Sequence, residues 1–178
     1  HSARAVLVNN LIAGNRMEGG LYIENSQVDL LHTTIAGNAG VGVYVDQNST
    51  VALTNTLLVD HGVGISVSGR STLTAAGVLW HNTPITVASA LTAARVTGEV
   101  WGDPAFVDPP GGDYHIQSPS AAINRGIDAG VLTDIDGDPR PYGPAPDLGA
   151  DEFPQLVLGL TKRAVPDSVQ TGGRITYT

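Results

Sequence analysis

The stretch Val28-Asp-Leu-Leu-His-Thr-Thr-Ile-Ala-Gly-Asn38 decides the fold, because it recurs 23 positions later as Val51-Ala-Leu-Thr-Asn-Thr-Leu-Leu-Val-Asp-His61. Val6-Leu-Val-Asn-Asn-Leu-Ile-Ala-Gly-Asn15 precedes both in the same register. Each unit consists of short runs of alternating apolar and polar residues separated by Gly and Asn, and none has the roughly 3.6-residue period of an amphipathic helix. A unit this short cannot bury its own apolar face, so stacked units are expected. We therefore predict an all-β parallel β-helix of about four to five coils.

The alternation within each unit assigns side chains to the inside or the outside of the solenoid. The predicted inward ladders are Leu21/Val43/Ile65/Ile85, Ile23/Val45/Val67/Val87, Val28/Val51/Leu73/Leu91 and Leu7/Leu30/Leu53/Ala75. The predicted outward ladder is Tyr22/Tyr44/Ser66/Thr86. The fourth coil is irregular, and either Leu79 or Trp80 is its buried residue.

Asn and His recur where the chain turns between strands. Asn15, Asn38, His61 and Asn82 take equivalent places, as do Asn9, His32 and Asn55. Stacked Asn side chains satisfy backbone groups in turns and tolerate left-handed geometry. We favour this structural role over a role of His32 or His61 as a base or ligand.

The chain has a formal net charge of -8, and the acidity is concentrated in one segment. Residues 101–152 hold ten acids against Arg125 and Arg140, and nine of the eleven prolines lie between residues 101 and 154. This composition predicts a loop-rich cap after coils that fill residues 1–100. With one lysine and eight arginines, the chain is a poor partner for nucleic acid. It also has no apolar stretch long enough for a membrane span.

The coils resemble those of right-handed, single-stranded parallel β-helix proteins such as pectate lyases, pectinases and many bacterial surface proteins. After residue 100 the resemblance becomes more specific. The segments Asp103-Pro-Ala-Phe-Val-Asp108, Gly112-Asp-Tyr-His-Ile116, Ser118-Pro-Ser-Ala-Ala-Ile-Asn124, Asp134-Ile-Asp-Gly-Asp-Pro-Arg140 and Asp147-Leu-Gly-Ala-Asp-Glu152 resemble the C-terminal cap of choice-of-anchor Q proteins. That resemblance implies a secreted or cell-surface bacterial solenoid.

Residues 153–178 contain a linker and a second resemblance. From Val157 to Thr178 the sequence is similar to the opening of an immunoglobulin-like repeat domain of bacterial surfaces. Two strands cannot close a sandwich of about seven strands. We therefore expect either a fragment of a longer protein or a tail that completes a sheet elsewhere.

Two binding sites are suggested by residue type and spacing. Tyr22 and Tyr44, with Ser66 and Thr86, form the candidate glycan or partner face, although the pair also fits an ordinary cross-strand contact. The loop with Asp134, Asp136 and Asp138 offers three carboxylates to a Ca²⁺ ion, although its Gly is misplaced for an EF-hand and a turn-rich cap explains it as well.

Catalytic residues are harder to find. The best cluster is Asp60 and His61 with Arg70 on the next strand, and the coils contain no motif of the lyases or pectinases. We therefore expect a non-catalytic extracellular solenoid with a structural, adhesive or glycan-binding role, whose partners are polysaccharides, cell-surface molecules or further copies stacked end to end. The alternative is a polysaccharide lyase or glycoside hydrolase with most catalytic residues outside these 178 positions.

Overall fold

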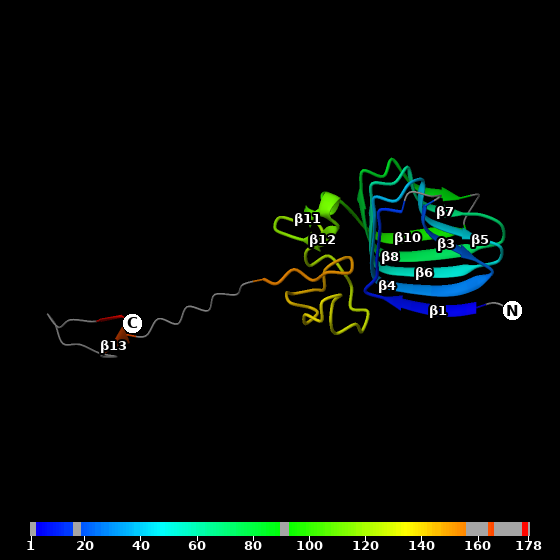
Figure 1. The fold of residues 1–178 in the computed structure, drawn as a ribbon. Coiled ribbons are helices and arrows are strands. Elements are labelled where there is room, and N and C mark those ends of the chain that lie inside the picture. Colours follow the sequence, from blue (N-terminus) through cyan, green and yellow to red (C-terminus); the bar gives the residue numbers. More distant parts are fainter. Residues whose placement is uncertain (1–2, 16–18, 90–92, 156–163, 166–175, 178) are drawn as a thin grey trace.

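The computed structural model describes residues 3–15, 19–89, 93–155, 164–165 and 176–177. Its parallel strands stack as an all-β solenoid of about four turns, which confirms the predicted fold class (Figure 1). One sheet contains β1 (Ala3–Val8), β2 (Leu11–Ala13), β4 (Ser26–Ala36), β6 (Thr50–Val59), β8 (Thr72–His81) and β10 (Ala94–Trp101). The other contains β3 (Gly19–Glu24), β5 (Val41–Asp46), β7 (Val63–Val67) and β9 (Ile85–Ser89). Their orders are β1-β4-β6-β8-β10, with β2 beside β4, and β3-β5-β7-β9.

Four short strands of the described part of the chain lie outside the solenoid. β11 (Phe106–Asp108) and β12 (Asp113–Ile116) form an antiparallel pair around a 3-10 turn at Pro109–Gly111. β13 (Ala164–Val165) and β14 (Thr176–Tyr177) form another antiparallel pair. Among the residues described, no helix has the length and apolar character needed to cross a membrane.

A ladder of left-handed residues bends the long strands of the first sheet. Asn9, His32 and Asn55 have φ values of 52°, 51° and 56°, and Gly77 and Gly98 continue the ladder. Asn and Gly tolerate this conformation, so one residue per coil suffices to turn the chain. The predicted equivalence of Asn9, His32 and Asn55 is confirmed.

The second ladder of turn residues differs from the prediction in its last member. Asn38 and His61 each reach a backbone carbonyl oxygen of the preceding coil, at 2.8 and 3.1 Å. Thr83, not Asn82, makes the corresponding contact in the next coil, at 3.3 Å. Asn82 instead pairs with Asp60, whose Oδ1 accepts from Asn82 Nδ2 at 2.9 Å. Asn is common at both turn positions, so residue type alone matched Asn82 to His61, whereas the structure matches Asn82 to Asp60 and Thr83 to His61.

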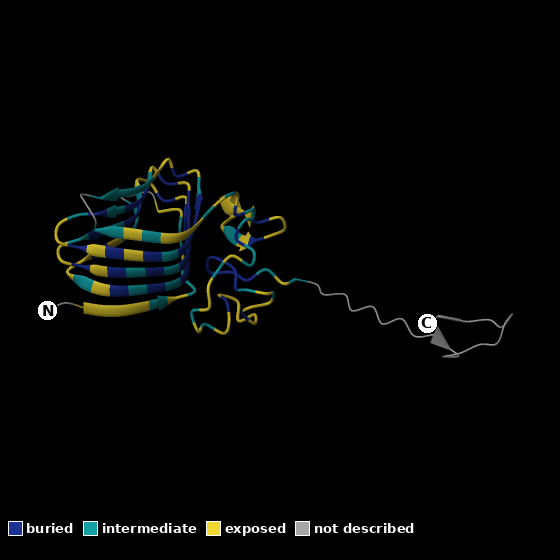
Figure 2. Cartoon of the chain, turned by 180° about the vertical axis from the view of Figure 1, so that it is seen from behind, coloured by how far each residue is buried: buried dark blue, intermediate teal, exposed yellow. Residues whose placement is uncertain are grey.

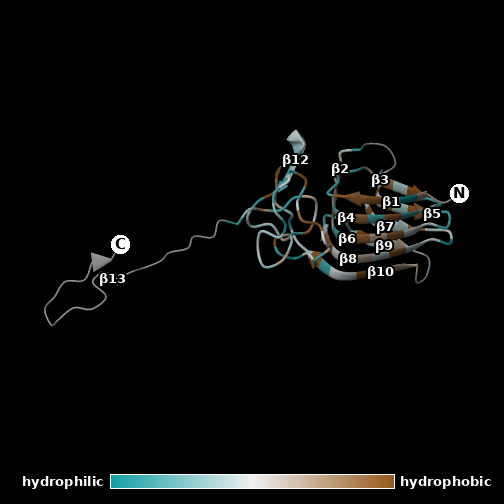
Figure 3. Cartoon of the chain, turned by 90° about the horizontal axis from the view of Figure 1, so that it is seen from below, coloured by the Kyte–Doolittle hydropathy of each residue, from teal (hydrophilic) through white to brown (hydrophobic). Residues whose placement is uncertain are grey.

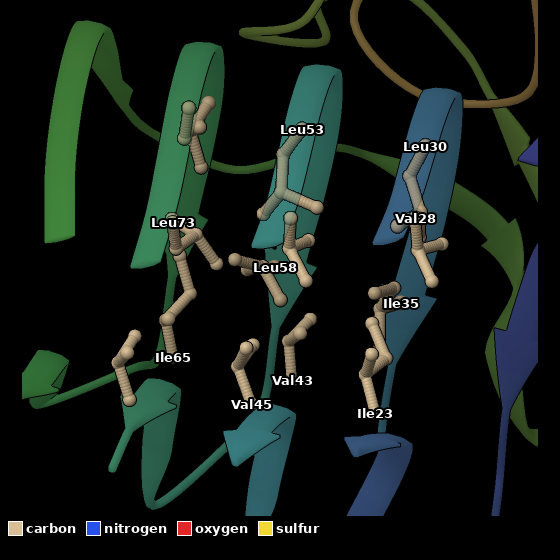
Figure 4. Close-up of a cluster of buried hydrophobic side chains, with 14 of the residues drawn as sticks. Ile23, Val28, Leu30, Ile35, Val43, Val45, Leu53, Leu58, Ile65 and Leu73 are labelled. Carbon is tan, nitrogen blue, oxygen red and sulfur yellow. The ribbon is translucent and has the colours of Figure 1, made fainter. Parts of the chain in front are cut away.

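Inward-facing aliphatic side chains fill the solenoid interior (Figure 4). Three predicted ladders are confirmed through the third coil, and Leu7/Leu30/Leu53/Ala75 is confirmed throughout. Apolar residues accordingly recur along the stacked strands in Figure 3.

The predicted register of the fourth coil is wrong. Ile85 pairs with Val63 and Val87 pairs with Ile65, whereas Ala94 pairs with Leu73. Leu91 lies outside the described residues. The run Ile-Thr-Val at 85–87 imitates Ile-Ser-Val at 65–67. That similarity suggested a deletion before residue 85, but the 22-residue spacing persists to β9 and the shorter spacing follows it.

Both candidates for the irregular core position are buried, because the wall of the solenoid has two apolar faces. Trp80 belongs to the interior cluster, whereas Leu79 belongs to a second cluster on the outer surface. Leu57 lies below Leu79 on the same outer surface and packs with Ile116 and Leu148 of the cap. The continuous buried bands of these strands are visible in Figure 2.

The cap lies beside the stack of coils and not over its last coil (Figure 1). Asn9 Nδ2 donates to the carbonyl oxygen of Thr133 at 2.8 Å, and Thr34 Oγ1 accepts from the amide of Ala150 at 3.0 Å. Asn55 bonds both backbone groups of Ile127, at 2.7 and 2.9 Å. The cap therefore spans three successive coils and covers their shared wall.

Candidate functional site

A pair of tyrosines marks the outer face of the second sheet. Tyr22 on β3 is in register with Tyr44 on β5, and their rings stack at a centroid distance of 4.9 Å and an interplanar angle of 7°. Two rings that lie edge to edge in one plane would clash at this centroid distance, so the rings of Tyr22 and Tyr44 are stacked face to face. Tyr44 Oη is 3.1 Å from Ser68 Oγ, which fixes its ring, while Tyr22 remains 59% exposed. The pair therefore presents the edges of two stacked rings on the outer face of the sheet.

The third and fourth positions of the tyrosine ladder differ in outcome. Ser66 is in register with Tyr44, as predicted. Ser66 pairs next with Ala88, so Thr86 does not belong to this ladder. The cause is the two-residue register error in the fourth coil. The candidate face therefore contains Tyr22, Tyr44 and Ser66 without Thr86.

Two carboxylates lie in register on the same face. Glu24 and Asp46 are in register on β3 and β5, two residues beyond the tyrosines, so they point to the same side. Gln47 Nε2 donates to Glu24 Oε2 at 2.8 Å. The signal was present in the sequence, because Tyr-Ile-Glu at 22–24 repeats as Tyr-Val-Asp at 44–46. This face combines aromatic, amide and carboxylate groups.

The residues of the weak catalytic cluster are not assembled into a reactive group. Asp60 and His61 follow β6, whereas Arg70 lies beyond the other end of β7. His61 is buried, and its Nδ1 and Nε2 each lie 3.1 Å from a backbone carbonyl oxygen. Asp60 accepts from Asn82. His61 acts as a buried turn residue in this geometry.

The acidic loop uses its first carboxylate for its own backbone. Asp134 is buried, and its Oδ1 accepts from the amides of Asp136 at 2.9 Å and Asp138 at 2.8 Å. Its Oδ2 accepts from the amide of Glu152 at 3.0 Å. Asp134 therefore organises the loop, and Ca²⁺ binding by Asp134, Asp136 and Asp138 stays a prediction.

A different group of ligand atoms comes together where the cap meets the first coils. Single ligand atoms of His115, Asp136 and Asp151 all lie within 4.8 Å of one another. His115 Nε2 is 2.7 Å from Asp136 Oδ2, and His115 Nδ1 is 2.5 Å from Asp113 Oδ1. A cavity of about 120 Å³ adjoins the group and is lined by all three residues. We call His115, Asp136 and Asp151 the junction cluster.

Hydrogen bonding and burial shift the pKa values of His115, Asp113 and Asp151. The hydrogen bond with Asp113 is the main reason that the pKa of His115 is raised to about 9, and the same bond lowers the pKa of Asp113. Burial raises the pKa of Asp151, whose Oδ2 accepts from the amide of Ile116 at 2.7 Å. At neutral pH, His115 is therefore an imidazolium held between carboxylates.

The cap also contains a buried ion pair that acts on structure. Arg140 Nη1 lies 3.0 Å from Glu152 Oε2, and its Nη2 donates to the carbonyl oxygens of Gly149 and Ala150 at 3.3 and 2.9 Å. Glu152 also accepts from the amides of Tyr142 and Asp147, at 2.8 and 2.9 Å. Glu152 thus binds backbone amides as well as Arg140, and so helps to hold the cap together.

Comparison with known proteins bears on the coils alone. Residues 1–79 match a protein-family model described as the right-handed beta helix region. No curated protein and no solved structure matched the chain. The resemblances to the choice-of-anchor Q cap and to an immunoglobulin-like domain stay predictions. The family match and the stacked parallel strands together support a right-handed β-helix repeat.

Proposed function

We propose that this chain is a non-catalytic binding solenoid of a secreted or cell-surface protein, and that it binds carbohydrate on the outer face of β3 and β5. The observation that carries the proposal is the stacked pair of Tyr22 and Tyr44, whose parallel rings lie 4.9 Å apart on the outer face of β3 and β5. A fixed aromatic ring offers apolar contact area at little cost in side-chain entropy. The resemblance of the cap to exported bacterial proteins supports the location.

The polar groups beside the tyrosines favour a class of sugar. Glu24 and Asp46 accept hydrogen bonds when ionised, and Gln47 adds an amide. Sugar hydroxyls and ammonium groups can donate to these carboxylates, whereas a uronate would be repelled. The expected ligand is therefore a neutral or amino-sugar polysaccharide.

The test is glycan-array binding followed by calorimetry with the best neutral or amino-sugar oligosaccharide. Tyr22→Ala should weaken binding about tenfold or more, since roughly 1.4 kcal/mol of contact energy corresponds to that factor. Tyr142→Ala is the matched control, because Tyr142 is an exposed tyrosine of the cap. Absence of any glycan ligand, or equal binding by Tyr22→Ala and the wild type, would overturn the proposal.

The enzymatic alternative needs groups for proton transfer next to a bound sugar. Among the residues described, Asp60 and Arg70 lie at opposite ends of β7, and both His61 ring nitrogens face carbonyl oxygens. The non-catalytic proposal expects no release of reducing ends or unsaturated uronates from pectins. Release that is abolished by Asp60→Asn would restore the lyase or hydrolase hypothesis.

A second non-catalytic function is the end-to-end assembly of copies of this chain. β9 and β10 are edge strands in the described sheets, with Ile85 and Trp101 exposed. Edge strands are templates for pairing with another chain. Light scattering across a concentration series should reveal oligomers if the coils stack, and monomers at every concentration would count against assembly.

A further inference from the structure

The junction cluster brings together ligand types from three separate segments of the cap. His115 lies on β12, Asp136 lies in the acidic loop, and Asp151 lies near the end of the cap. Their ligand atoms, one nitrogen and two oxygens, lie within 4.8 Å of one another. Tetrahedral ligands of Zn²⁺ at about 2.1 Å from the metal would be about 3.4 Å apart. Side-chain movements of about 1 Å would therefore bring the three ligand atoms to the separation that a bound Zn²⁺ ion requires.

Each ligand is positioned by a neighbour outside the cluster. Asp113 Oδ1 holds His115 Nδ1 at 2.5 Å, which directs Nε2 toward the two carboxylates. A metal ion that binds at Nε2 replaces the proton there, and this proton is released to solvent. The amide of Ile116 donates to Asp151 Oδ2 at 2.7 Å, and Asp134 Oδ1 holds the amide of Asp136 at 2.9 Å. A carboxylate on the far nitrogen of a ligating histidine is the usual outer-shell partner in metal sites.

The surroundings fit a bound cation and its remaining ligands. The cavity of about 120 Å³ beside the cluster is lined by Leu11 and Thr34 of the solenoid as well as by the cluster itself. It has room for metal-bound water, which would complete the coordination. Two carboxylates and one imidazole suit a divalent transition metal, whereas Ca²⁺ requires six to eight oxygen ligands.

We propose that His115, Asp136 and Asp151 bind a divalent transition-metal ion, with Zn²⁺ as the best fit, and that the ion links three segments of the cap beside the first coils. Because the site lies on the cap and not on β3 and β5, it is independent of carbohydrate binding. Its role is structural: the ion fixes β12, the acidic loop and the end of the cap in one arrangement.

The experiment is calorimetric titration of the chelator-treated, desalted chain with Zn²⁺, in parallel with Ca²⁺ and Mg²⁺. One equivalent of Zn²⁺ should bind with a dissociation constant in the micromolar range or below. At a hundredfold excess over that constant, Tm should rise by about 5–10 °C. Co²⁺ in place of Zn²⁺ should give a visible absorption band of nitrogen and oxygen ligation.

Substitutions separate this site from adventitious binding to acidic residues. Asp136→Asn and His115→Gln should each weaken Zn²⁺ binding tenfold or more and remove the Co²⁺ band, and Asp113→Asn should weaken binding by about 10- to 100-fold. Asp138→Asn removes the same charge from the same loop outside the cluster and should leave Zn²⁺ affinity unchanged. Circular dichroism of the metal-free variants checks that they fold.

Three results would overturn the proposal. The first is the absence of saturable Zn²⁺ binding below about 100 μM. The second is wild-type affinity in folded His115→Gln. The third is an equal loss in Asp138→Asn and Asp136→Asn, which would assign binding to the acidic loop alone.

Discussion

His32 predicts a pH dependence of stability that can be measured. It is fully buried in the ladder of left-handed residues, and its Nε2 lies 2.9 Å from Asn55 Nδ2. Burial, reinforced by the charge of Arg140, lowers its pKa from 6.5 to about 4. Between these two values the unfolded chain binds a proton that the folded chain does not, so the free energy of unfolding falls as the pH falls.

The size of the effect follows from the two pKa values. The difference between these two pKa values corresponds to at most about 3.4 kcal/mol. About 1.4 kcal/mol should be lost at pH 5.5 and about 2.5 kcal/mol at pH 4.5, relative to pH 8. Burial raises the pKa of Asp147 to about 6. That group stabilises the fold as the pH falls from about 6 to about 4, so the wild-type profile alone is ambiguous.

Substitution of His32 by Asn isolates its contribution. Asn occupies the equivalent places at Asn9 and Asn55 with φ of 52° and 56°, so the corner conformation is retained. Urea unfolding followed by circular dichroism should be run on both proteins at pH 8, 5.5 and 4.5. Between pH 8 and pH 4.5, the unfolding free energy of the wild type should fall by about 2.5 kcal/mol more than that of His32→Asn. A difference that stays constant within about 0.5 kcal/mol would refute the argument.

Two further substitutions test the packing of the coils and the cap. Gly64→Ala places a Cβ 2.5 Å from the Trp80 ring and 2.8 Å from the Thr86 carbonyl oxygen, so urea unfolding should show a loss of about 1–3 kcal/mol. Gly62→Ala meets only one atom, at 3.6 Å, and should stay within about 0.5 kcal/mol of the wild type. Equal effects of the two would contradict the packing argument. Glu152→Gln removes the partner of the buried Arg140 and should cost about 3–5 kcal/mol, measured in the same way, against an unchanged control, Glu24→Gln on the exposed face. A loss below about 1 kcal/mol would mean that Arg140 is neutralised by other groups.

The coils were predictable because stacking imposes a period. Leu30 and Leu53 recur in register, and a ladder of this kind requires the same residue type at the same face in each turn. The prediction failed where residue types coincided at two positions, as with Asn82 and with the run 85–87. Hydrogen bonds and register resolve these cases, and neither is visible in composition.

The junction cluster could not be predicted in the same way. His115 meets Asp136 across 21 residues and Asp151 across 36 residues of irregular chain that lacks any repeat. The sequence grouped Asp134, Asp136 and Asp138 because they are neighbours. The backbone of the loop instead occupies Asp134 and leaves Asp136 to face β12. Proximity along the chain therefore could not reveal that His115 and Asp151 lie beside Asp136.

The position of the cap did have a signal in the sequence. A strand with one solvated face alternates polar and apolar residues, whereas a strand buried on both faces is a continuous apolar run. Leu57-Leu58-Val59 and Val78-Leu79-Trp80 are such runs, and they are buried throughout. Their outward side chains require an apolar partner outside the coils, and Ile116 and Leu148 provide it. The same runs therefore determine which wall the cap covers, and a cap on that wall places β12 and the junction cluster beside Leu11 and Thr34.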